Sequence, residues 1–209
     1  MSGSIAEAPL GTQKADKPSA TLNSEPMIIG LFGINGSGKT SLLKNLRKVL
    51  GKDEWVFYDS SQLIAVFYSG GVEGFTSLSE YDKRLQRGLA SERLKRECVK
   101  SGKDGVAVGH YMSWDVGQAT GNVVCTQQEL DAFTHILYLD TPVERIAEGD
   151  KGVPDRKRQI EHLAKWQEEE RTRLRDRCRD SKITFTVVPL PDKTVLTRII
   201  ALRSATIPR

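Results

Sequence analysis

Residues 33–40 read GINGSGKT and match the pattern G-x-x-x-x-G-K-T in full. The segment follows an apolar run, residues 27–32, and precedes residues 41–50, whose apolar positions have helical spacing. A buried strand, a glycine-rich loop and a helix thus follow one another as this motif requires. We interpret residues 33–40 as a phosphate-binding loop. A glycine-rich turn that matches by chance is the alternative, and the flanking strand and helix argue against it.

The loop predicts a nucleotide site made largely of backbone. Its glycines let successive N–H groups and the helix N-terminus converge on phosphate oxygens. Lys39 is expected to reach the β- and γ-phosphates of ATP, and the Thr40 hydroxyl to bind Mg²⁺. The nucleotide contacts predicted from the loop are Gly33, Asn35, Gly36, Ser37, Gly38, Lys39, Thr40 and Ser41.

A chain of 209 residues can bury one substantial core. Residues 1–26 are rich in Ser, Ala, Pro and Gly without apolar periodicity, so we expect a disordered tail there. The predicted folded domain covers residues 27–203, and residues 204–209 are a tail or the start of a linker. No targeting signal is evident in the tail.

Composition bounds the location and the partners. No apolar stretch is long enough to span a bilayer, and three scattered cysteines suit a reduced cytoplasmic compartment. Each cysteine is expected to pack as a small hydrophobic residue. The net charge of +4 is too small to imply a nucleic-acid partner, although it does not exclude one.

Five apolar or β-branched runs predict strands at residues 27–32, 55–58, 106–111, 135–140 and 183–188. Helical patterns separate them at residues 41–50, 60–68, 79–101, 126–133, 142–148 and 154–179. Alternation of this kind predicts an α/β protein with three layers, in which helices cover both faces of a five-stranded parallel sheet. Ligands of such folds bind at the carboxyl ends of the strands.

Asp59 follows the second predicted strand, so its carboxylate is expected near the γ-phosphate. There it can orient an acceptor hydroxyl and take its proton, or help to hold Mg²⁺ through water. The alternative is an N-cap of the helix predicted at residues 60–68.

The third and fourth predicted strands raise a question about the metal. Many phosphate-loop enzymes carry an acidic residue after the third strand, where this chain has His110. That difference argues against a motor-type ATPase or a GTPase. Asp140 is the other candidate for the acidic position, but Thr141 and Pro142 after it favour a helix start capped by Asp140 or Thr141.

Two segments around the helix at residues 79–101 are candidates for the acceptor side. Residues 70–74 are glycine-rich and predict a flexible loop able to open and close over a substrate. One of Arg84, Arg87 and Arg93 is a candidate to bind the acceptor; a solvated face paired with nearby glutamates is the alternative.

The long helix at residues 154–179 carries an apolar stripe through Ile160, Leu163, Ala164, Leu174 and Cys178, on which Gln167 and Arg171 also fall. Arg171 either stabilises charge on the transferring phosphate or pairs with Glu168 or Asp140. Glu169 and Glu170 are expected on the solvated side, among the arginines at 173, 175, 177 and 179.

Residues 149–158 form a short basic segment between two helical patterns. They predict a small lid that excludes water from the triphosphate. An ordinary solvated turn is the alternative.

These features resemble the nucleoside and nucleotide kinase-like group of phosphate-loop enzymes, which includes adenylate, shikimate and gluconate kinases. The resemblance covers residues 27–203 and rests on residues 33–40, Asp59, residues 141–145 and Arg171. It implies that Asp59 contacts the acceptor hydroxyl, that Arg145 contacts ATP, and that the loop containing Pro191 lies beside the adenine. The Asp-Gly pair of adenylate kinases is missing and the lid is shorter, which puts a nucleoside monophosphate acceptor in doubt.

The segments at residues 109–111 (GHY) and 163–167 (LAKWQ) look more like a fungal subgroup whose kinase domain is often fused to another enzyme. One member type is the nucleoside kinase domain of cordycepin-type biosynthesis, an adenosine 3′-kinase. This resemblance implies that the chain is the front domain of a longer protein, with residues 207–209 at a linker.

We therefore expect a kinase that uses ATP and Mg²⁺ to phosphorylate a hydroxyl of a small molecule, with a nucleoside as the first choice. The predicted catalytic residues are Lys39, Asp59 and Arg171. A polynucleotide 5′-kinase and a regulatory module that binds ATP without turnover remain alternatives.

Overall fold

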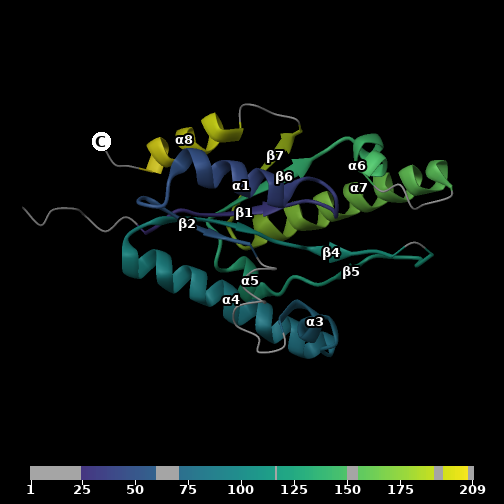
Figure 1. Cartoon of the computed structure of the whole chain (residues 1–209), viewed down its shortest axis with the longest axis horizontal. Helices are drawn as coiled ribbons and strands as arrows, with labels where there is room; N and C mark the ends of the chain where they lie inside the picture. The colour runs from purple at the N-terminus through teal and green to yellow at the C-terminus, as the bar shows by residue number, and fades with distance from the viewer. Residues whose placement is uncertain (1–24, 60–70, 116, 150–154, 191–194, 207–209) are drawn as a thin grey trace, which may run out of the picture.

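A computed structural model describes residues 25–59, 71–115, 117–149, 155–190 and 195–206. Its main sheet has five parallel strands in the order β2-β3-β1-β6-β7 (Figure 1). The strands are β1 (Ile28–Phe32), β2 (Trp55–Tyr58), β3 (Asp104–Val108), β6 (His135–Asp140) and β7 (Thr184–Pro189). The predicted α/β fold is confirmed. β3 ends at Val108, before the expected limit of residue 111, so Gly109 and His110 lie beyond the strand.

β1 is the central strand, and all five of its residues are buried. Gly30 lies opposite Ala107 of β3 on one side and Ile136 of β6 on the other. A continuous apolar run is what a strand covered on both faces requires. Because the strands are parallel, the loop after β1 shares one edge of the sheet with the segments that follow the other strands.

Helices cover both faces of the sheet. On one face, α1 (Lys39–Leu50) and α8 (Val195–Thr206) pack against the strands through Leu43, Leu46, Val195 and Ile199. The opposite face is covered by α4 (Glu80–Ser101), α5 (Gln127–Leu130) and α7 (Arg156–Asp180). Figure 1 shows α1 and α8 together on one side of the sheet and α4 and α5 on the other.

One expected loop is helical. Residues 71–76 form α3 (Gly71–Thr76), so the prediction of a flexible loop at residues 70–74 is wrong for this part. Phe75 of α3 is buried, and the guanidinium of Arg87 lies 5.6 Å from the centre of its ring. This contact with α4 outweighs the low helix propensity of the glycines.

Two further elements lie outside the sequence prediction. The first is α8. The second is an antiparallel pair of very short strands, β4 (Met112–Ser113) and β5 (Asn122–Val123), at the carboxyl end of the sheet. Strands of this length carry too little periodicity to be recognised in a sequence.

Several predictions fall outside the described residues. They concern most of the N-terminal tail, the helix at residues 60–68, the centre of the lid at residues 150–154, and Pro191. The helices that flank the lid are α6 (Val143–Gly149) and α7.

The buried stripe of α7 differs from the predicted one. It consists of Gln159, Leu163, Trp166, Glu170, Leu174 and Cys178. Ala164 is exposed, whereas Glu170, expected on the solvated side, is only 1% exposed. The bulky Trp166 side chain turns the helix so that residues 163, 166 and 170 face the core.

Cys98 and Cys178 are buried, Cys125 is half-buried, and none of the three forms a disulfide. Burial raises the pKa of the Cys98 and Cys178 thiols to about 12, which makes them poor nucleophiles. Among the described residues, no helix combines the length and apolar character that crossing a membrane demands.

Candidate active site

The phosphate loop owes its shape to glycines. Gly33, Gly36 and Gly38 have φ values of 141°, 81° and 92°, in the region that favours glycine. A Cβ atom on Gly36 would lie 2.8 Å from a methyl group of Ile146, so space also requires glycine there. Gly38 is the N-cap of α1, so the first N–H groups of this helix lie at the end of the phosphate loop. This cradle fits the phosphates of a nucleotide.

Lys39, the first residue of α1, is buried and folded back onto the loop. Its Nζ donates hydrogen bonds to the carbonyl oxygens of Gly33 and Ile34, at 2.5 and 2.9 Å. Burial lowers the pKa of Lys39 to about 8, while the nearby Glu170 acts to raise it. The ammonium therefore lies within the loop that is to receive the phosphates.

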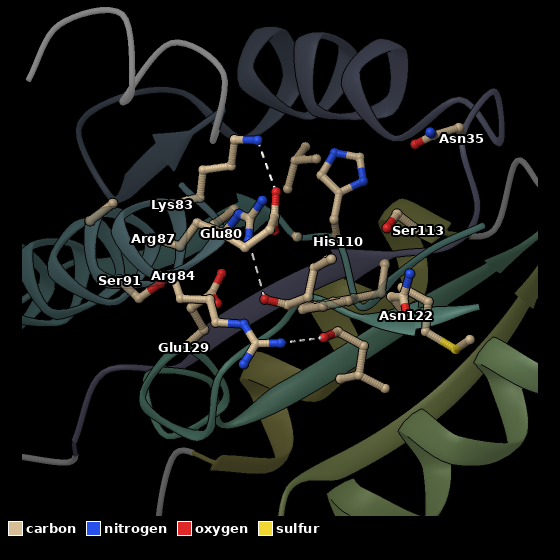
Figure 2. A pocket seen from close by; sticks show the side chains of 18 of the residues that line it. Asn35, Glu80, Lys83, Arg84, Arg87, Ser91, His110, Ser113, Asn122 and Glu129 are labelled. Atoms are coloured by element: carbon tan, nitrogen blue, oxygen red, sulfur yellow. Dashed lines mark hydrogen bonds and ion pairs between the residues drawn. The ribbon is translucent and has the colours of Figure 1, made fainter. Parts of the chain in front are cut away.

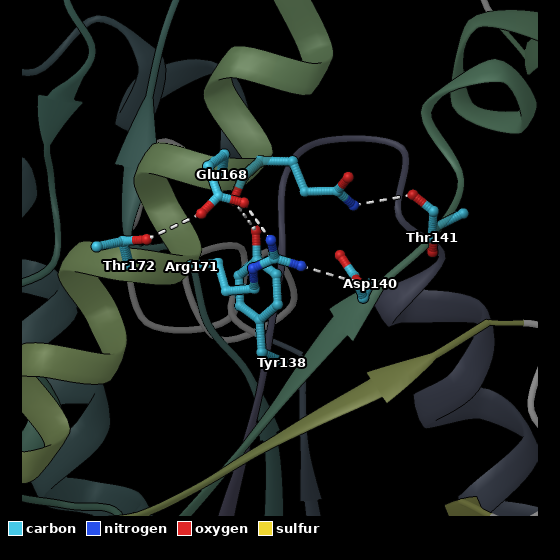
Figure 3. Close-up of polar contacts among 7 residues, drawn as sticks. Tyr138, Asp140, Thr141, Glu168, Arg171 and Thr172 are labelled. Carbon is cyan, nitrogen blue, oxygen red and sulfur yellow. Dashed lines mark hydrogen bonds and ion pairs between the residues drawn. The ribbon is translucent and has the colours of Figure 1, made fainter.

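A chain of hydrogen bonds holds the loop in place, and Figure 3 shows the part of it that joins Thr141 and Tyr138 to α7. The Thr141 hydroxyl donates to the carbonyl of Ser37 at 2.7 Å, and the Gln167 amide donates to the carbonyl of Thr141 at 2.8 Å. The Tyr138 hydroxyl donates to the carbonyl of Gln167 at 3.1 Å. The loop is thus connected through the end of β6 to the middle of α7.

Thr40 is exposed at the start of α1, where its hydroxyl is available as an oxygen ligand. Among the described residues there is no group of three His, Cys, Asp or Glu side chains arranged to hold a metal. Mg²⁺ commonly takes one or two protein oxygens together with substrate phosphates and water. Thr40 therefore fits Mg²⁺ that arrives with a nucleotide rather than a metal held by the protein alone.

Arg171 lies between two carboxylates in Figure 3. Its Nη1 is 3.0 Å from Asp140, and its Nη2 pairs with Glu168. This is the pairing alternative of the sequence analysis, and it also engages Asp140, the second candidate for an acidic metal ligand. Arg145 is exposed on α6, and Ser41 is exposed on α1.

A pocket of about 960 Å³ opens beside the phosphate loop (Figure 2). Asn35 of the loop lines it, together with residues of α4, the segment after β3, and the β4–β5 pair. In Figure 2 the side chains of α4 lie on one side, Asn35, Ser113 and Asn122 on the other, and His110 between them. Its apolar lining includes Phe32, Phe75 and Phe133.

The cations of α4 that line the pocket already have partners. Arg84 donates to the carbonyl of Val123 at 3.1 Å, and Arg87 donates to that of Val124 at 3.2 Å. Lys83 pairs with Glu80 at 2.8 Å. Arg84 and Arg87 therefore link α4 to the opposite wall. The third candidate arginine, Arg93, is not among the lining residues.

Lys39 and Asp59 both act electrostatically on His110. Asp59 is buried just after β2, and His110 is accessible to the open pocket although protein surrounds much of its ring. This desolvation lowers the pKa of His110 to about 4, with Lys39 and Arg87 adding to the effect and Asp59 opposing it. The imidazole is therefore neutral at neutral pH.

Three polar residues of this region were not predicted from the sequence: Thr141 as a support of the loop, Glu129 in the pocket lining, and Glu170, on which the charge of Lys39 acts. Burial raises the pKa of Glu129, and the hydrogen bonds from Thr126 oppose that shift. A capping-box sequence at residues 126–129 was the available signal for Glu129. The burial of Glu170 could have been predicted from an apolar stripe of α7 that includes Trp166.

Comparisons with known proteins agree with this fold. A protein-family model described as an AAA domain matches residues 32–167, well over half of the chain. A sugar kinase from Janibacter sp. HTCC2649, solved without ligand, aligns with a TM-score of 0.50 at 14% identity over 88% of this chain and 99% of its own. Shikimate kinase from Acinetobacter baumannii, solved with shikimate, aligns with a TM-score of 0.46 at 18% identity, over 88% of this chain and 96% of its own.

No curated protein matches the chain significantly. The likeness to the sugar kinase shows a shared fold and, at 14% identity, nothing about substrates. The family match includes the phosphate loop, the pocket and the first half of α7. The chain therefore belongs to the AAA domain family.

Proposed function

We propose that the protein is a kinase that transfers the γ-phosphate of ATP to a hydroxyl group of a small molecule. The observation that carries the proposal is the position of the 960 Å³ pocket, whose lining runs from Asn35 of the phosphate loop to His110 after β3. An acceptor in this pocket lies next to bound phosphates, which is the proximity that direct transfer requires.

In this mechanism the loop amides and Lys39 bind the β- and γ-phosphates, and Asn35, Ser37 and Ser41 complete the contacts. Mg²⁺, held in part by Thr40, would offset the negative charge that develops on the phosphate oxygens. Asp59 orients the acceptor hydroxyl and accepts its proton. The neutral His110 offers a hydrogen bond to the acceptor without adding a charge.

Two arginines complete the proposal. Arg145, exposed on α6, contacts the phosphates of bound ATP. Arg171 stabilises the transferring phosphate, and to reach it the guanidinium has to leave Asp140 or Glu168.

We propose a nucleoside as acceptor, with the ribose 3′-hydroxyl of adenosine as the first position to test. The aromatic lining of the pocket suits a flat base, and Ser113, Asn122 and Glu129 offer hydrogen bonds to hydroxyl groups. The partners that Lys83, Arg84 and Arg87 already have favour a neutral acceptor over an anionic one. A cytoplasmic location and fusion to a second enzyme domain belong to the same proposal.

The test is ADP release from MgATP in the presence of nucleosides, nucleotides, sugars and short oligonucleotides, with phosphorus NMR on each product. Stimulation by a nucleoside and a new phosphate ester on its ribose would support the proposal. Preference for oligonucleotides would indicate a polynucleotide 5′-kinase. Tight ATP binding with no product would favour a regulatory module.

A further inference from the structure

Glu170 is a buried carboxylate with no role in the mechanism above. It lies on α7, and only 1% of its surface is exposed. Its Oε2 accepts hydrogen bonds from the backbone N–H of Met112 at 3.1 Å and from the indole N–H of Trp166 at 3.3 Å. Among the described residues, no group donates to its Oε1.

Burying such a side chain is unfavourable for folding. A carboxylate without full hydrogen bonding loses free energy when it leaves water, and an apolar residue of similar volume would often pack as well. Burial raises the pKa of Glu170 to about 7, against the attraction of Lys39 and the two hydrogen bonds. Packing alone therefore gives no reason for a carboxylate at this position.

Glu170 contacts the pocket wall and acts electrostatically on the phosphate loop. Met112 lines the pocket and begins β4, just after His110. Lys39 belongs to the phosphate loop, and its charge and that of Glu170 influence one another. On the same turn of α7, Gln167 is tied through Thr141 to the loop residue Ser37.

Lys39 of α1 is a cation whose charge acts to lower the pKa of this carboxylate. Two groups that carry no charge at neutral pH also sense its charge, Tyr138 of β6 and Cys125 before α5. Lys39 and Glu170 thus influence one another's charge.

We propose that Glu170 is a positioning residue for phosphoryl transfer: through Met112 it fixes the acceptor wall, and through its charge it keeps Lys39 directed at the phosphate site. This inference rests on the proposed function. It assigns two separable contributions to one side chain, a hydrogen bond to the wall and a charge facing the loop.

Two substitutions separate these contributions. Glu170→Ala removes both, whereas Glu170→Gln keeps an oxygen for the Met112 N–H and removes only the charge. Glu170→Ala is expected to raise KM for the acceptor about tenfold or more, with KM for ATP little changed, since small misplacements of a reacting group are costly. Glu170→Gln is expected to return KM for the acceptor to the wild-type value. Its kcat is expected to be about tenfold below that of the wild type, because the charge that acts on Lys39 is lost.

A second measurement does not depend on turnover. Hydrogen exchange of the Met112 amide is expected to be faster in Glu170→Ala and unchanged in Glu170→Gln. Thus, if the wild-type chain phosphorylates no acceptor, the proposed function fails while the exchange rates still test the link to the wall. If Glu170→Ala does not fold, the low kcat with normal KM in Glu170→Gln carries the test.

Glu169→Gln is the matched control, because Glu169 is the neighbouring residue of α7 and pairs with Arg173 at 2.6 Å. It is expected to change neither KM, kcat nor the exchange of the Met112 amide. Equal exchange in all variants, or a Gln variant with wild-type kcat, would overturn the proposal. So would a lower melting temperature of Glu170→Ala with unaltered KM values, since that is the signature of a purely structural residue.

Discussion

The phosphate loop and the pocket wall beside it meet at one edge of the sheet, but they are built in different ways. The loop is eight consecutive residues, and the proposed phosphate contacts come mostly from its backbone. The wall is assembled from α4, the segment after β3 and the β4–β5 pair, which are linked by Arg84 and Arg87. Local sequence determines the first region, and contacts between distant residues determine the second.

This difference separates what the two regions do. A backbone cradle recognises any phosphate chain, so it specifies the nucleotide and little else. The wall presents side chains, and these decide which acceptor fits. Substitutions in the loop are therefore expected to affect every reaction of the protein, whereas substitutions in the wall are expected to discriminate between acceptors.

The largest effect is expected from Lys39→Ala in the loop. Loss of a buried charge at the phosphates should lower kcat about 10²- to 10³-fold with every acceptor, as loss of a donor to a charged transition state does elsewhere. The measurement is the rate of ADP formation. Lys44→Ala, an exposed site on the same helix, is the control and should keep the wild-type rate. A loss restricted to one acceptor would contradict the division between loop and wall.

Asp59→Asn tests the junction of the two regions. Without a carboxylate to accept the hydroxyl proton, transfer is expected to slow about 10²-fold or more, while the affinity for MgADP stays the same. Single-turnover rates and calorimetric titration measure the two quantities. Asp53→Asn, on the exposed turn before β2, is the control. Near-normal transfer would remove Asp59 from its proposed role.

Gly109→Ala tests the wall. A Cβ atom here would lie 2.3 Å from the Phe32 ring, so either the ring or the wall has to move. We expect a loss of about 1–3 kcal/mol in the free energy of unfolding. KM for the acceptor is expected to rise more than KM for ATP. Denaturant unfolding and steady-state kinetics report these effects. Gly149→Ala, where a Cβ atom meets nothing within 4 Å, should be close to neutral.

The smallest effect concerns the charge of His110. Its pKa in the folded chain is about 4, below the usual value of 6.5, so between these pH values the unfolded chain binds a proton that the folded chain does not. The contribution of neutral His110 to the free energy of unfolding is therefore present above about pH 6.5 and is lost as the pH falls towards 4. Unfolding at several pH values, compared with His110→Asn, should reveal this extra acid sensitivity in the wild type alone. Parallel pH profiles would contradict it.

The same division explains what could be predicted from the sequence. The parallel sheet, the loop and α1 follow from local patterns, because an apolar run, fixed glycines and helical spacing each act over a few residues. The pocket wall could not be predicted, since two-residue strands such as β4 and β5 have no period. α3 could not be predicted because its glycines suggest a loop, and its helical form is supported by a contact with α4 between distant positions in the sequence.

The long helix gives the clearest lesson for the candidate site. Both Arg171 and Glu170 can be placed on an apolar stripe, depending on whether the stripe passes through Ala164 or Trp166. The larger side chain loses more by exposure, so Trp166 selects the stripe and Glu170 becomes buried. Arg171 consequently lies at the margin, where Asp140 and Glu168 pair with it.

The hydrogen bonds that join α4 to the opposite wall have an evolutionary consequence. Arg84 and Arg87 bind the carbonyl oxygens of Val123 and Val124, which every amino acid possesses. The side chains at these positions can therefore change without loss of the anchor. A lineage can exchange the surface that meets the acceptor while the architecture around it persists, so new substrates are accessible by substitution alone, without insertion or deletion.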